Sequence, residues 1–423
     1  MLNNQLFVLE CEVGLEQIVI DEVNFRCSLA DIPVPFKVET CYSQPTGFVR
    51  LLVEHQYTTF NNKHPEIFKK IFHVIKDTLT AKRFFLSVNS VPLRLLGIEN
   101  VDKISRELDF FRLKEEIAFT LQQIKIIPKL PKIGEITIQN VSTHDISSFL
   151  DGNTKKQIND ILLKSAAGST IWKRKDSEVI NQSLSIIISK DMISFGIMHE
   201  SLLFCNRIPN RLIKRHQTPL SPDVAAALVL KTFRRLREKP NLDRRRVIVL
   251  DPFCGFGTIC NIAACNAHFL KDWAAPVIQK SADTMKIQII GTDSQEKSIE
   301  NANENLQLLR KEHGQDADVE FITIDIESLR KSHERYLGGS FVILIISQPP
   351  YGFTINLDEK KLRSLYRSFL KLDDEIATQR EVIASFITGR EDLVLKLTRD
   401  YQITAEIQKK GKKYAIFEKK NSS

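Results

Sequence analysis

The sequence predicts an α/β protein whose C-terminal part is a mainly parallel sheet covered by helices, preceded by smaller α+β units. After Arg246, short apolar runs alternate with longer amphipathic stretches, which is the pattern of buried parallel strands separated by helices. The chain of 423 residues is also longer than a single hydrophobic core usually supports, so we expect two or three domains. Hydrophobic residues make up 43% of the chain and charged residues 26%, which favours a globular protein over a disordered one.

The N-terminal half alternates between strand and helix patterns in two α+β blocks. The first block predicts strands at 6–9 and 48–53 and helices at 14–23 and 66–79. The prolines and the glycine of residues 128–134 predict a linker. The second block predicts a strand at 135–141, a helix at 153–167 and two strands at 183–189 and 193–198.

The C-terminal half predicts buried strands, helices between them and a final hairpin. The expected strands are 247–250, 287–290, 321–324, 341–346 and 382–387. Helical spacing is found at 222–238, 296–310 and 358–377. The last two strands, 401–408 and 414–418, are joined by Lys409-Lys-Gly-Lys-Lys413, and they predict a hairpin at the edge of the sheet.

The net charge of +8 is concentrated in one part of the chain. Residues 207–246, which we call the basic segment, contain twelve Lys or Arg and only three acidic residues. Neutralisation of nucleic-acid phosphates requires a concentration of positive charge of this kind. The alternative is a solvated helix and linker that happen to be basic. The charge favours a nucleic-acid partner, and the expected contacts are Arg211, Arg215, Arg234, Arg235 and Arg237.

Several classes of protein are disfavoured by the sequence. No apolar run reaches the ~18 residues of a membrane helix, and the first ten residues lack the basic region and cleavage site of a secretion signal. Seven cysteines without a Cys-x-x-Cys pair fit reduced thiols, so we expect a cytoplasmic protein. Cys254, Cys260 and Cys265 lie close together, but their spacing fits packing on a helix better than a metal site.

The first motif with chemical content is Asp251-Pro-Phe-Cys-Gly-Phe-Gly-Thr258, which lies between an apolar strand and a helix. Gly255 and Gly257 allow a tight turn and the close approach of a ligand, and the following helix offers backbone amides to a carboxylate. Asp293 and Asp325 end the next two strands. A structural turn would explain the glycines alone, but acids at three successive strand ends indicate a ligand of the adenosine type. Without a third glycine, the motif is poorly suited to a pyrophosphate.

The second motif, Ser347-Gln-Pro-Pro-Tyr-Gly-Phe353, follows the apolar strand at 341–346. Ligands of open α/β sheets bind at the carboxyl ends of the strands, so an ordinary Pro-Pro turn is the less favoured explanation. The side-chain amide of Gln348 and the carbonyl of Pro349 would accept hydrogen bonds from an amino group, and Tyr351 would stack on a base. Holding both N–H bonds points the nitrogen lone pair at a methyl donor, so catalysis is expected to consist mainly of orientation.

Together, residues 251–258 and Gln348-Pro-Pro-Tyr-Gly352 resemble the exocyclic-amine branch of class I S-adenosylmethionine-dependent methyltransferases, whose motif reads Asn/Asp-Pro-Pro-Tyr/Phe. Residues 216–228 and 8–16 resemble segments of the THUMP-domain RNA methyltransferases. The resemblance implies an enzyme that makes N2-methylguanosine in tRNA or large-subunit rRNA. It also implies four parts: a ferredoxin-like domain at 1–127, a THUMP-like RNA-binding domain at 128–205, a basic linker and helix at 206–246, and a Rossmann-like methyltransferase domain at 247–423.

The resemblance implies a role for each motif residue. The expected contacts to S-adenosylmethionine are Thr218, Asp251, Pro252, Cys254, Gly255, Gly257, Thr258, Asp293 and Asp325. The glycine-rich motif would hold the methionine end of the cofactor, Asp293 the ribose and Asp325 the adenine amine. The expected catalytic residues are Gln348, Pro349, Pro350 and Tyr351, which would hold a base flipped out of the RNA. No metal is expected.

The sequence departs from the family pattern at two positions. Gln348 replaces the usual Asn or Asp and adds one methylene, and Phe256 stands where a small residue usually lies between the glycines. Because a misplacement of about 1 Å can slow a reaction about 100-fold, a catalytically weak or silent RNA-binding protein is the main alternative. A DNA methyltransferase or a protein glutamine methyltransferase would use a similar loop, but the basic segment argues against both. Whether a small activating subunit is needed stays open.

Overall fold

The computed structural model describes residues 4–33, 36–41, 47–53, 65–92, 136–145, 180–188, 192–199, 220–239, 242–243, 245–275, 285–313, 317–339, 342–351, 358–409 and 412–420. The chain divides into two compact units, Met1–Asn206 and Arg207–Ser423. The linker predicted at 128–134 and the helix predicted at 153–167 lie outside the described residues.

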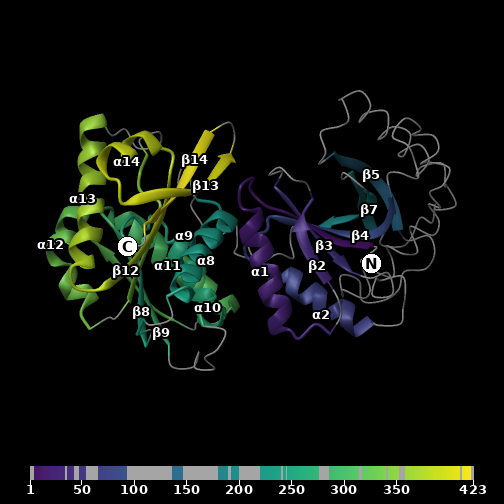
Figure 1. Ribbon diagram of the computed structural model, residues 1–423, viewed down its shortest axis with the longest axis horizontal. Helices are drawn as coiled ribbons and strands as arrows, with labels where there is room; N and C mark the ends of the chain where they lie inside the picture. Colours follow the sequence, from purple (N-terminus) through teal and green to yellow (C-terminus); the bar gives the residue numbers. More distant parts are fainter. Residues whose placement is uncertain are drawn as a thin grey trace. The chain divides into compact units, whose positions relative to one another are not determined.

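The N-terminal unit contains one sheet whose strand order is β2-β3-β1-β4-β7-β6-β5 (Figure 1). Its strands are β1 (Asn4–Glu10), β2 (Phe36–Thr40), β3 (Phe48–Val53), β4 (Arg83–Pro92), β5 (Ile136–Asp145), β6 (Ile180–Ile188) and β7 (Met192–His199), and its described helices are α1 (Glu16–Leu29) and α2 (Pro65–Lys76). β4 pairs with β7, so a single sheet continues across the predicted ferredoxin-like and THUMP-like parts. Their division into two domains therefore stays a prediction.

Packing explains why α1 and α2 lie against this sheet. The apolar residues of α1 recur at helical spacing and are buried, as Ile18, Val19 and Val23 are. Four phenylalanine rings gather between α2 and the strands, with ring centroids 6.0 to 6.5 Å apart; they are Phe7, Phe68, Phe72 and Phe84. Offset and edge-on aromatic pairs at such distances are favourable, so this cluster fixes α2 on the sheet.

The C-terminal unit contains the predicted doubly wound sheet, in the strand order β10-β9-β8-β11-β12-β14-β13. Its strands are β8 (Arg246–Asp251), β9 (Lys286–Asp293), β10 (Asp318–Thr323), β11 (Val342–Ser347), β12 (Glu381–Thr388), β13 (Tyr401–Lys409) and β14 (Lys412–Lys419). The pairs from β10 to β12 are parallel, whereas β14 is antiparallel to both β12 and β13. The α/β class and the edge hairpin are thereby confirmed.

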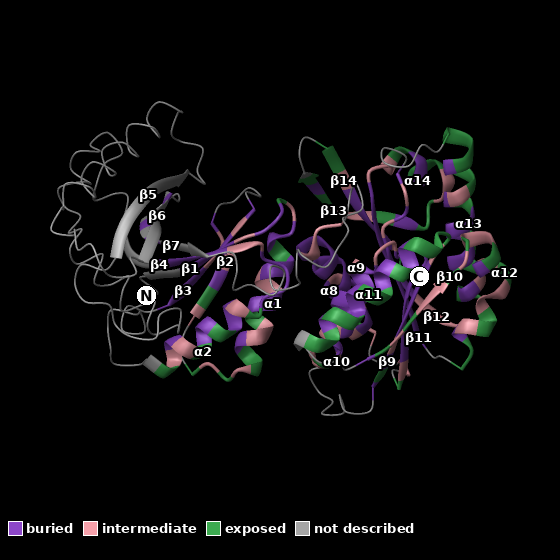
Figure 2. Cartoon of the chain, turned by 180° about the vertical axis from the view of Figure 1, so that it is seen from behind, coloured by how far each residue is buried: buried purple, intermediate pink, exposed green. Residues whose placement is uncertain are grey.

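Helices cover both faces of this sheet (Figure 1). One face carries α8 (Pro222–Arg237), α9 (Thr258–Cys265), α10 (Ala267–Ala274) and α11 (Glu296–His313), and the other carries α12 (Ile326–Leu337) and α13 (Glu359–Ala377), with α14 (Glu391–Leu397) packed against α13. The central strands and the inner faces of these helices are buried (Figure 2). Strands buried on both faces are nearly continuous apolar runs, as in β11, where Val-Ile-Leu-Ile-Ile precedes the terminal Ser347.

None of the described helices combines the length and the apolarity that crossing a membrane requires. In the same part of the chain, no group of three or more His, Cys, Asp or Glu side chains is arranged to hold a metal ion.

Candidate functional site

The candidate site lies at the carboxyl edge of the parallel strands, where the two sequence motifs meet. β8 is the central strand between β9 and β11, so Asp251, Asp293 and Ser347 end three adjacent strands. The loop after β8 is held to its neighbour by a hydrogen bond from the amide of Cys254 to the carbonyl of Thr292 (2.8 Å). α11 holds the same loop, because the side-chain amide of Asn305 donates to the carbonyl of Phe256 (3.0 Å).

Asp251 is a buried acid that connects the two motifs. Its side chain is 1% exposed, and its Oδ1 accepts hydrogen bonds from the Ser347 hydroxyl (2.5 Å) and the Phe253 amide (3.1 Å). Burial raises the pKa of Asp251 to about 7, although the hydrogen bond from Ser347 opposes this change. Ser347 directly precedes Gln348, so one carboxylate fixes both the glycine-rich loop and the end of β11.

Asp293 fixes the opposite side of the glycine-rich loop. Its Oδ2 accepts a hydrogen bond from the amide of Gly255 (3.2 Å), and its Oδ1 accepts one from the amide of Gln295 (2.9 Å). The side chain is half-buried. A half-buried carboxylate at this edge of the sheet is of the kind that accepts hydrogen bonds from ribose hydroxyls, and this role of Asp293 stays a prediction.

The two glycines of the motif are required for different structural reasons. Gly255 has φ +53°, and a Cβ at this position would meet no atom within 4 Å, so the backbone faces open space. A Cβ on Gly257 would instead lie 2.9 Å from the ring of Phe321, and one on Gly291 would lie 2.6 Å from the same ring. Gly255 is therefore the glycine that leaves room for a ligand, whereas Gly257 and Gly291 allow β10 to pack against the loop.

The remaining residues expected at the cofactor are placed around this loop. Pro252 and Cys254 are buried, and Thr258 is half-buried at the start of α9. Burial raises the pKa of the Cys254 thiol, so this side chain is a packing group in the described structure. Cys260 is likewise buried and Cys265 half-buried, as expected for cysteines that pack on a helix. Thr218 lies outside the described residues.

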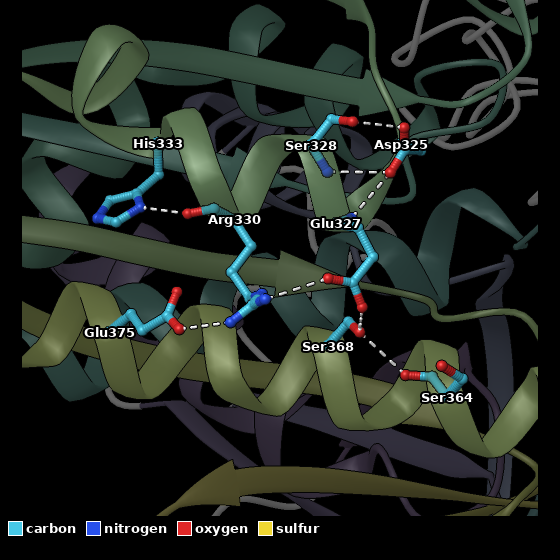
Figure 3. A network of polar contacts seen from close by, with 8 residues as sticks. All are labelled: Asp325, Glu327, Ser328, Arg330, His333, Ser364, Ser368 and Glu375. Atoms are coloured by element: carbon cyan, nitrogen blue, oxygen red, sulfur yellow. Dashed lines mark hydrogen bonds and ion pairs between the residues drawn. The ribbon is translucent and has the colours of Figure 1, made fainter.

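Asp325 begins α12 and caps it (Figure 3). Its Oδ1 accepts from the amides of Glu327 and Ser328 (3.0 Å each), and its Oδ2 accepts from the Ser328 hydroxyl (2.7 Å). These bonds, led by the one from the Ser328 amide, hold the pKa of Asp325 below its usual value. The carboxylate is exposed and already serves as a helix cap, so its contact with an adenine amine stays a prediction.

A polar network behind Asp325 joins α12 to α13 (Figure 3). Glu327 accepts a hydrogen bond from the Ser368 hydroxyl, and Arg330 forms ion pairs with Glu375 (2.7 Å) and Glu327 (3.3 Å). The network keeps the start of α12 in place at the sheet edge, and with it the position of Asp325.

The loop after β11 carries the second motif. Pro349 and Tyr351 are buried, whereas Gln348 and Pro350 are half-buried. The ring of Tyr351 lies edge-on against Tyr414 of β14, with centroids 5.7 Å apart and planes at 81°. Burial and a hydrogen bond with Tyr351 raise the pKa of Tyr414 to about 12. Tyr351 thus contacts its own unit, and its stacking on a base stays a prediction; sequence reasoning did not identify Tyr414.

The described part of the basic segment contacts its own unit extensively. Arg235 donates to the backbone carbonyls of Ala384 and Lys419, and Arg237 lies 5.2 Å from the ring of Trp273. Arg234 pairs with Glu238 (3.2 Å). Lys231 and Lys239 pair with acids of the sheet. Arg211 and Arg215 lie outside the described residues.

The C-terminal unit is similar to known methyltransferase domains. Residues 209–413 match the family model described as "RMKL-like, methyltransferase domain", so this unit contains a methyltransferase domain. The tRNA (guanine(10)-N2)-dimethyltransferase of Methanothermobacter thermautotrophicus is 30% identical over 122 residues, which are 29% of this chain and 27% of that protein. The chain thus matches only about a quarter of that relative's length.

Similar solved structures extend over the whole chain. One, described as "a possible methylase from Clostridium difficile 630", has 15% identity and a TM-score of 0.62, covering 100% of this chain and 99% of the other. A second, from Listeria monocytogenes and described as "a predicted N6-adenine-specific DNA methylase", has 17% identity and a TM-score of 0.60, covering 99% and 96%. A third, described as "SMU.472, a putative methyltransferase complexed with SAH", has 16% identity and a TM-score of 0.60, covering 99% of this chain and 98% of the other. At these identities the likeness shows the fold of both units.

Proposed function

We propose that this protein transfers a methyl group from S-adenosylmethionine to an exocyclic amine of a base in structured RNA, with guanine N2 in tRNA as the preferred target. The observation that carries the proposal is the meeting of the two motifs at one sheet edge, where Ser347 and Asp251 connect the glycine-rich loop to the Gln348 loop. The methyltransferase domain match supports the reaction. The similarity to a tRNA guanine-N2 methyltransferase supports the substrate.

The residues at the edge fit the cofactor. When bound, S-adenosylmethionine supplies an electrophilic methyl group. The open space at Gly255 admits a ligand against the loop backbone, and the half-buried carboxylate of Asp293 is placed to accept hydrogen bonds from ribose hydroxyls. Asp251 lies deeper and fixes the loop from below, and the start of α9 at Thr258 offers backbone amides to a carboxylate.

Gln348 and Pro349 would hold the target amine. The side-chain oxygen of Gln348 and the carbonyl of Pro349 would each accept one N–H, which directs the lone pair of the nitrogen toward the methyl group. This effect is orientation of a weak nucleophile rather than proton transfer, so the chain needs no general base at this loop. The target nucleobase would have to be flipped out of the RNA helix. The N-terminal unit, with its predicted ferredoxin-like and THUMP-like parts, would hold the RNA during this step.

Transfer of tritium from labelled S-adenosylmethionine to pools of small RNA tests the proposal. We expect the wild type to label tRNA. Gln348→Ala should abolish labelling while cofactor affinity, measured by calorimetry, stays unchanged, because Gln348 contacts the target and not the cofactor. Gln348→Asn is the sharper variant. In a pocket adapted to the longer side chain, Gln348→Asn should slow the reaction, because the Asn side chain is shorter by one methylene.

The second candidate function is RNA binding without catalysis, and the departure at Gln348 is the observation that favours it. In that case Gln348→Asn should restore labelling or raise it, because it returns the usual geometry. If the wild type and the Asn variant both fail to label every RNA pool, the methyltransferase proposal is wrong. The cytoplasmic location and the activating subunit stay predictions that these experiments do not address.

A further inference from the structure

Helix α13 begins at the sheet edge that carries the candidate site. Arg390, which follows the end of β12, donates to the Glu359 carboxylate in the first turn of α13 (2.9 and 3.0 Å). Further along the helix, the Tyr366 hydroxyl lies 2.6 Å from the hydroxyl of Thr388, the last residue of β12. Because β12 runs parallel to β11, these contacts hold the start of α13 at the carboxyl edge of the parallel strands. α13 is also the first described element after the Gln348 loop.

The acidic residues of α13 attach the helix to its neighbours. Each of its four acids forms an ion pair with a residue outside the helix, and the pairs are Glu359 with Arg390 (2.9 Å), Glu375 with Arg330 (2.7 Å), Asp373 with Lys419 (2.7 Å) and Asp374 with Lys419 (3.5 Å). Their partners belong to the start of α14, to α12 and to β14. The negative charge of α13 is therefore used on the sides of the helix that contact the rest of the unit.

Three basic residues of α13 form a stripe on its outer face. Lys360, Arg367 and Lys371 are exposed, and their spacing of seven and four residues places them on one side of the helix, opposite its buried residues (Figure 2). Within the part of the chain that the structure describes, the one ion pair of a basic residue of α13 is that of Lys361 with Asp358 (3.8 Å). We call Lys360, Arg367 and Lys371 the outer stripe.

Helix stability does not explain the outer stripe. Lys360 lies in the first turn, where the helix dipole favours acidic side chains over basic ones. Arg367 and Lys371 are four residues apart, and like charges at this spacing destabilise a helix. Folding of the unit therefore gains nothing from these three charges, whereas a bound polyanion would relieve their repulsion.

We propose that the outer stripe of α13 binds the phosphate backbone of the substrate RNA beside the nucleotide that is methylated. The inference rests on the proposed function, because the polyanion is its RNA substrate. From Lys360 to Lys371 the helix rises about 16 Å, so the stripe follows a strand and does not bind a single phosphate. Contacts to phosphates position a nucleic acid without reading its sequence. Since α13 starts at the edge of the candidate site, a strand on this face leads toward the Gln348 loop.

Binding of unfractionated tRNA to the full chain, measured between about 50 and 200 mM salt, tests the stripe. The test variant, which we call the α13 variant, carries Lys360→Gln, Arg367→Gln and Lys371→Gln. The matched control, the α11 variant, removes three exposed cations from the opposite face of the sheet by Lys297→Gln, Arg310→Gln and Lys311→Gln. Both variants lower the net charge of +8 by the same amount, so a difference between them reports the position of the charges.

We expect the α13 variant to lose about tenfold or more in affinity at the lowest salt concentration. Its slope of log affinity against log salt should fall by about 0.7 to 0.9 for each phosphate contact removed, while the α11 variant keeps the wild-type slope. A wild-type slope in the α13 variant, or an equal fall in both variants, overturns the inference while the proposed function stands. If the wild type shows no salt-dependent binding of tRNA, the proposed function fails together with the inference.

Thermal denaturation and calorimetry separate binding from folding. The α13 variant removes like-charge neighbours and a cation from the first turn, so its melting temperature should equal or exceed that of the wild type. The outer stripe is separate from the residues proposed to hold the cofactor, so affinity for S-adenosylmethionine should be the same in all three proteins. A lower melting temperature together with weaker cofactor binding would mean that the loss of RNA affinity comes from unfolding, and the inference would be wrong.

Discussion

Asp251→Asn should make the protein more stable at neutral and alkaline pH, although Asp251 lies at the start of the glycine-rich loop that is proposed to hold the cofactor. The carboxyl is fully buried and burial raises its pKa to about 7, compared with about 3.9 for an ordinary Asp. Between these values the folded state keeps a proton that the unfolded state releases, so stability falls as the pH rises through this window. The full difference corresponds to at most about 4 kcal/mol at pH 8, because each pH unit between the two values contributes about 1.4 kcal/mol.

The substitution removes this cost without removing the hydrogen bonds. An Asn Oδ1 accepts from the Ser347 hydroxyl and the Phe253 amide as the present Oδ1 does. At pH 8 we expect Asp251→Asn to be about 2 to 4 kcal/mol more stable than the wild type, which raises the melting temperature by about 2 to 4 °C per kcal/mol. At pH 4, where Asp251 is protonated in the folded state, most of the gap should close.

Thermal denaturation at pH 4 and pH 8 measures both differences, and Asp325→Asn is the matched control. The pKa of Asp325 is lowered, so its carboxylate stabilises the fold above its ordinary pKa, and its replacement should have the opposite sign at pH 8. If Asp251→Asn gives no gain at pH 8, or a gain of the same size at pH 4, then the buried carboxylate does not destabilise the fold as the structure implies. Asp251→Asn should also bind S-adenosylmethionine more weakly, because the substitution removes the negative charge of the carboxylate that fixes the glycine-rich loop.

Three further predictions concern the candidate cofactor site and the basic segment. Asp293→Ala should weaken S-adenosylmethionine binding about 10- to 100-fold, since hydrogen bonds to a charged acceptor are worth about 1.5 to 3 kcal/mol; unchanged calorimetric affinity would remove Asp293 from the site. Gly291→Ala should lower stability by about 1 to 3 kcal/mol, because its Cβ would lie 2.6 Å from a ring carbon of Phe321 in β10. Gly255→Ala meets no atom, but its backbone has φ +53°, so it should lower stability by about 1 to 2 kcal/mol through left-handed strain and should also weaken cofactor binding. An unchanged melting temperature in Gly291→Ala, or unchanged calorimetric affinity in Gly255→Ala, would contradict these assignments. Arg234→Gln with Arg237→Gln should flatten the salt dependence of tRNA binding, and an unchanged slope would mean that α8 faces away from the RNA.

The sheet of the C-terminal unit could be predicted because its strands are buried on both faces. Such strands are continuous apolar runs that need no long-range information to recognise, and β11 at Val342–Ser347 was expected at 341–346. β2 at Phe36–Thr40 was not predicted, because this edge strand of five residues, Phe-Lys-Val-Glu-Thr, buries only Val38 and has too few apolar residues for a clear pattern. Edge strands depend on pairing with a neighbour, which a single segment of sequence does not contain.

The position of a site residue could be predicted where the residue lies at the end of a recognisable strand. A contact between residues of two different strands could not be predicted. Asp251 and Asp293 end apolar runs, so their positions at the sheet edge could be predicted from the sequence alone. The bond between Ser347 and Asp251 joins residues 96 positions apart and depends on the register of β11 with β8. The number of charges in the basic segment likewise contains no information on long-range contacts. It could not show that Lys231 and Arg235 lie within ion-pair distance of Glu418, on a strand nearly two hundred residues later.

The connection between the two loops determines how the site accommodates its unusual glutamine. Asp251 is buried and hydrogen-bonded to both the Ser347 hydroxyl and the backbone of its own loop, so the end of β11 is fixed relative to the glycine-rich loop. In the proposed function, the extra methylene of Gln348 would therefore displace the bound amine rather than the strand. A displacement of about 1 Å would slow the reaction about 100-fold unless the base moves with it. In the proposed function the base would stack on Tyr351, whose ring contacts Tyr414 of the β13–β14 hairpin. If the proposed function holds, adaptation to Gln348 should therefore be found in the position of the Tyr351 ring and of Tyr414 beside it.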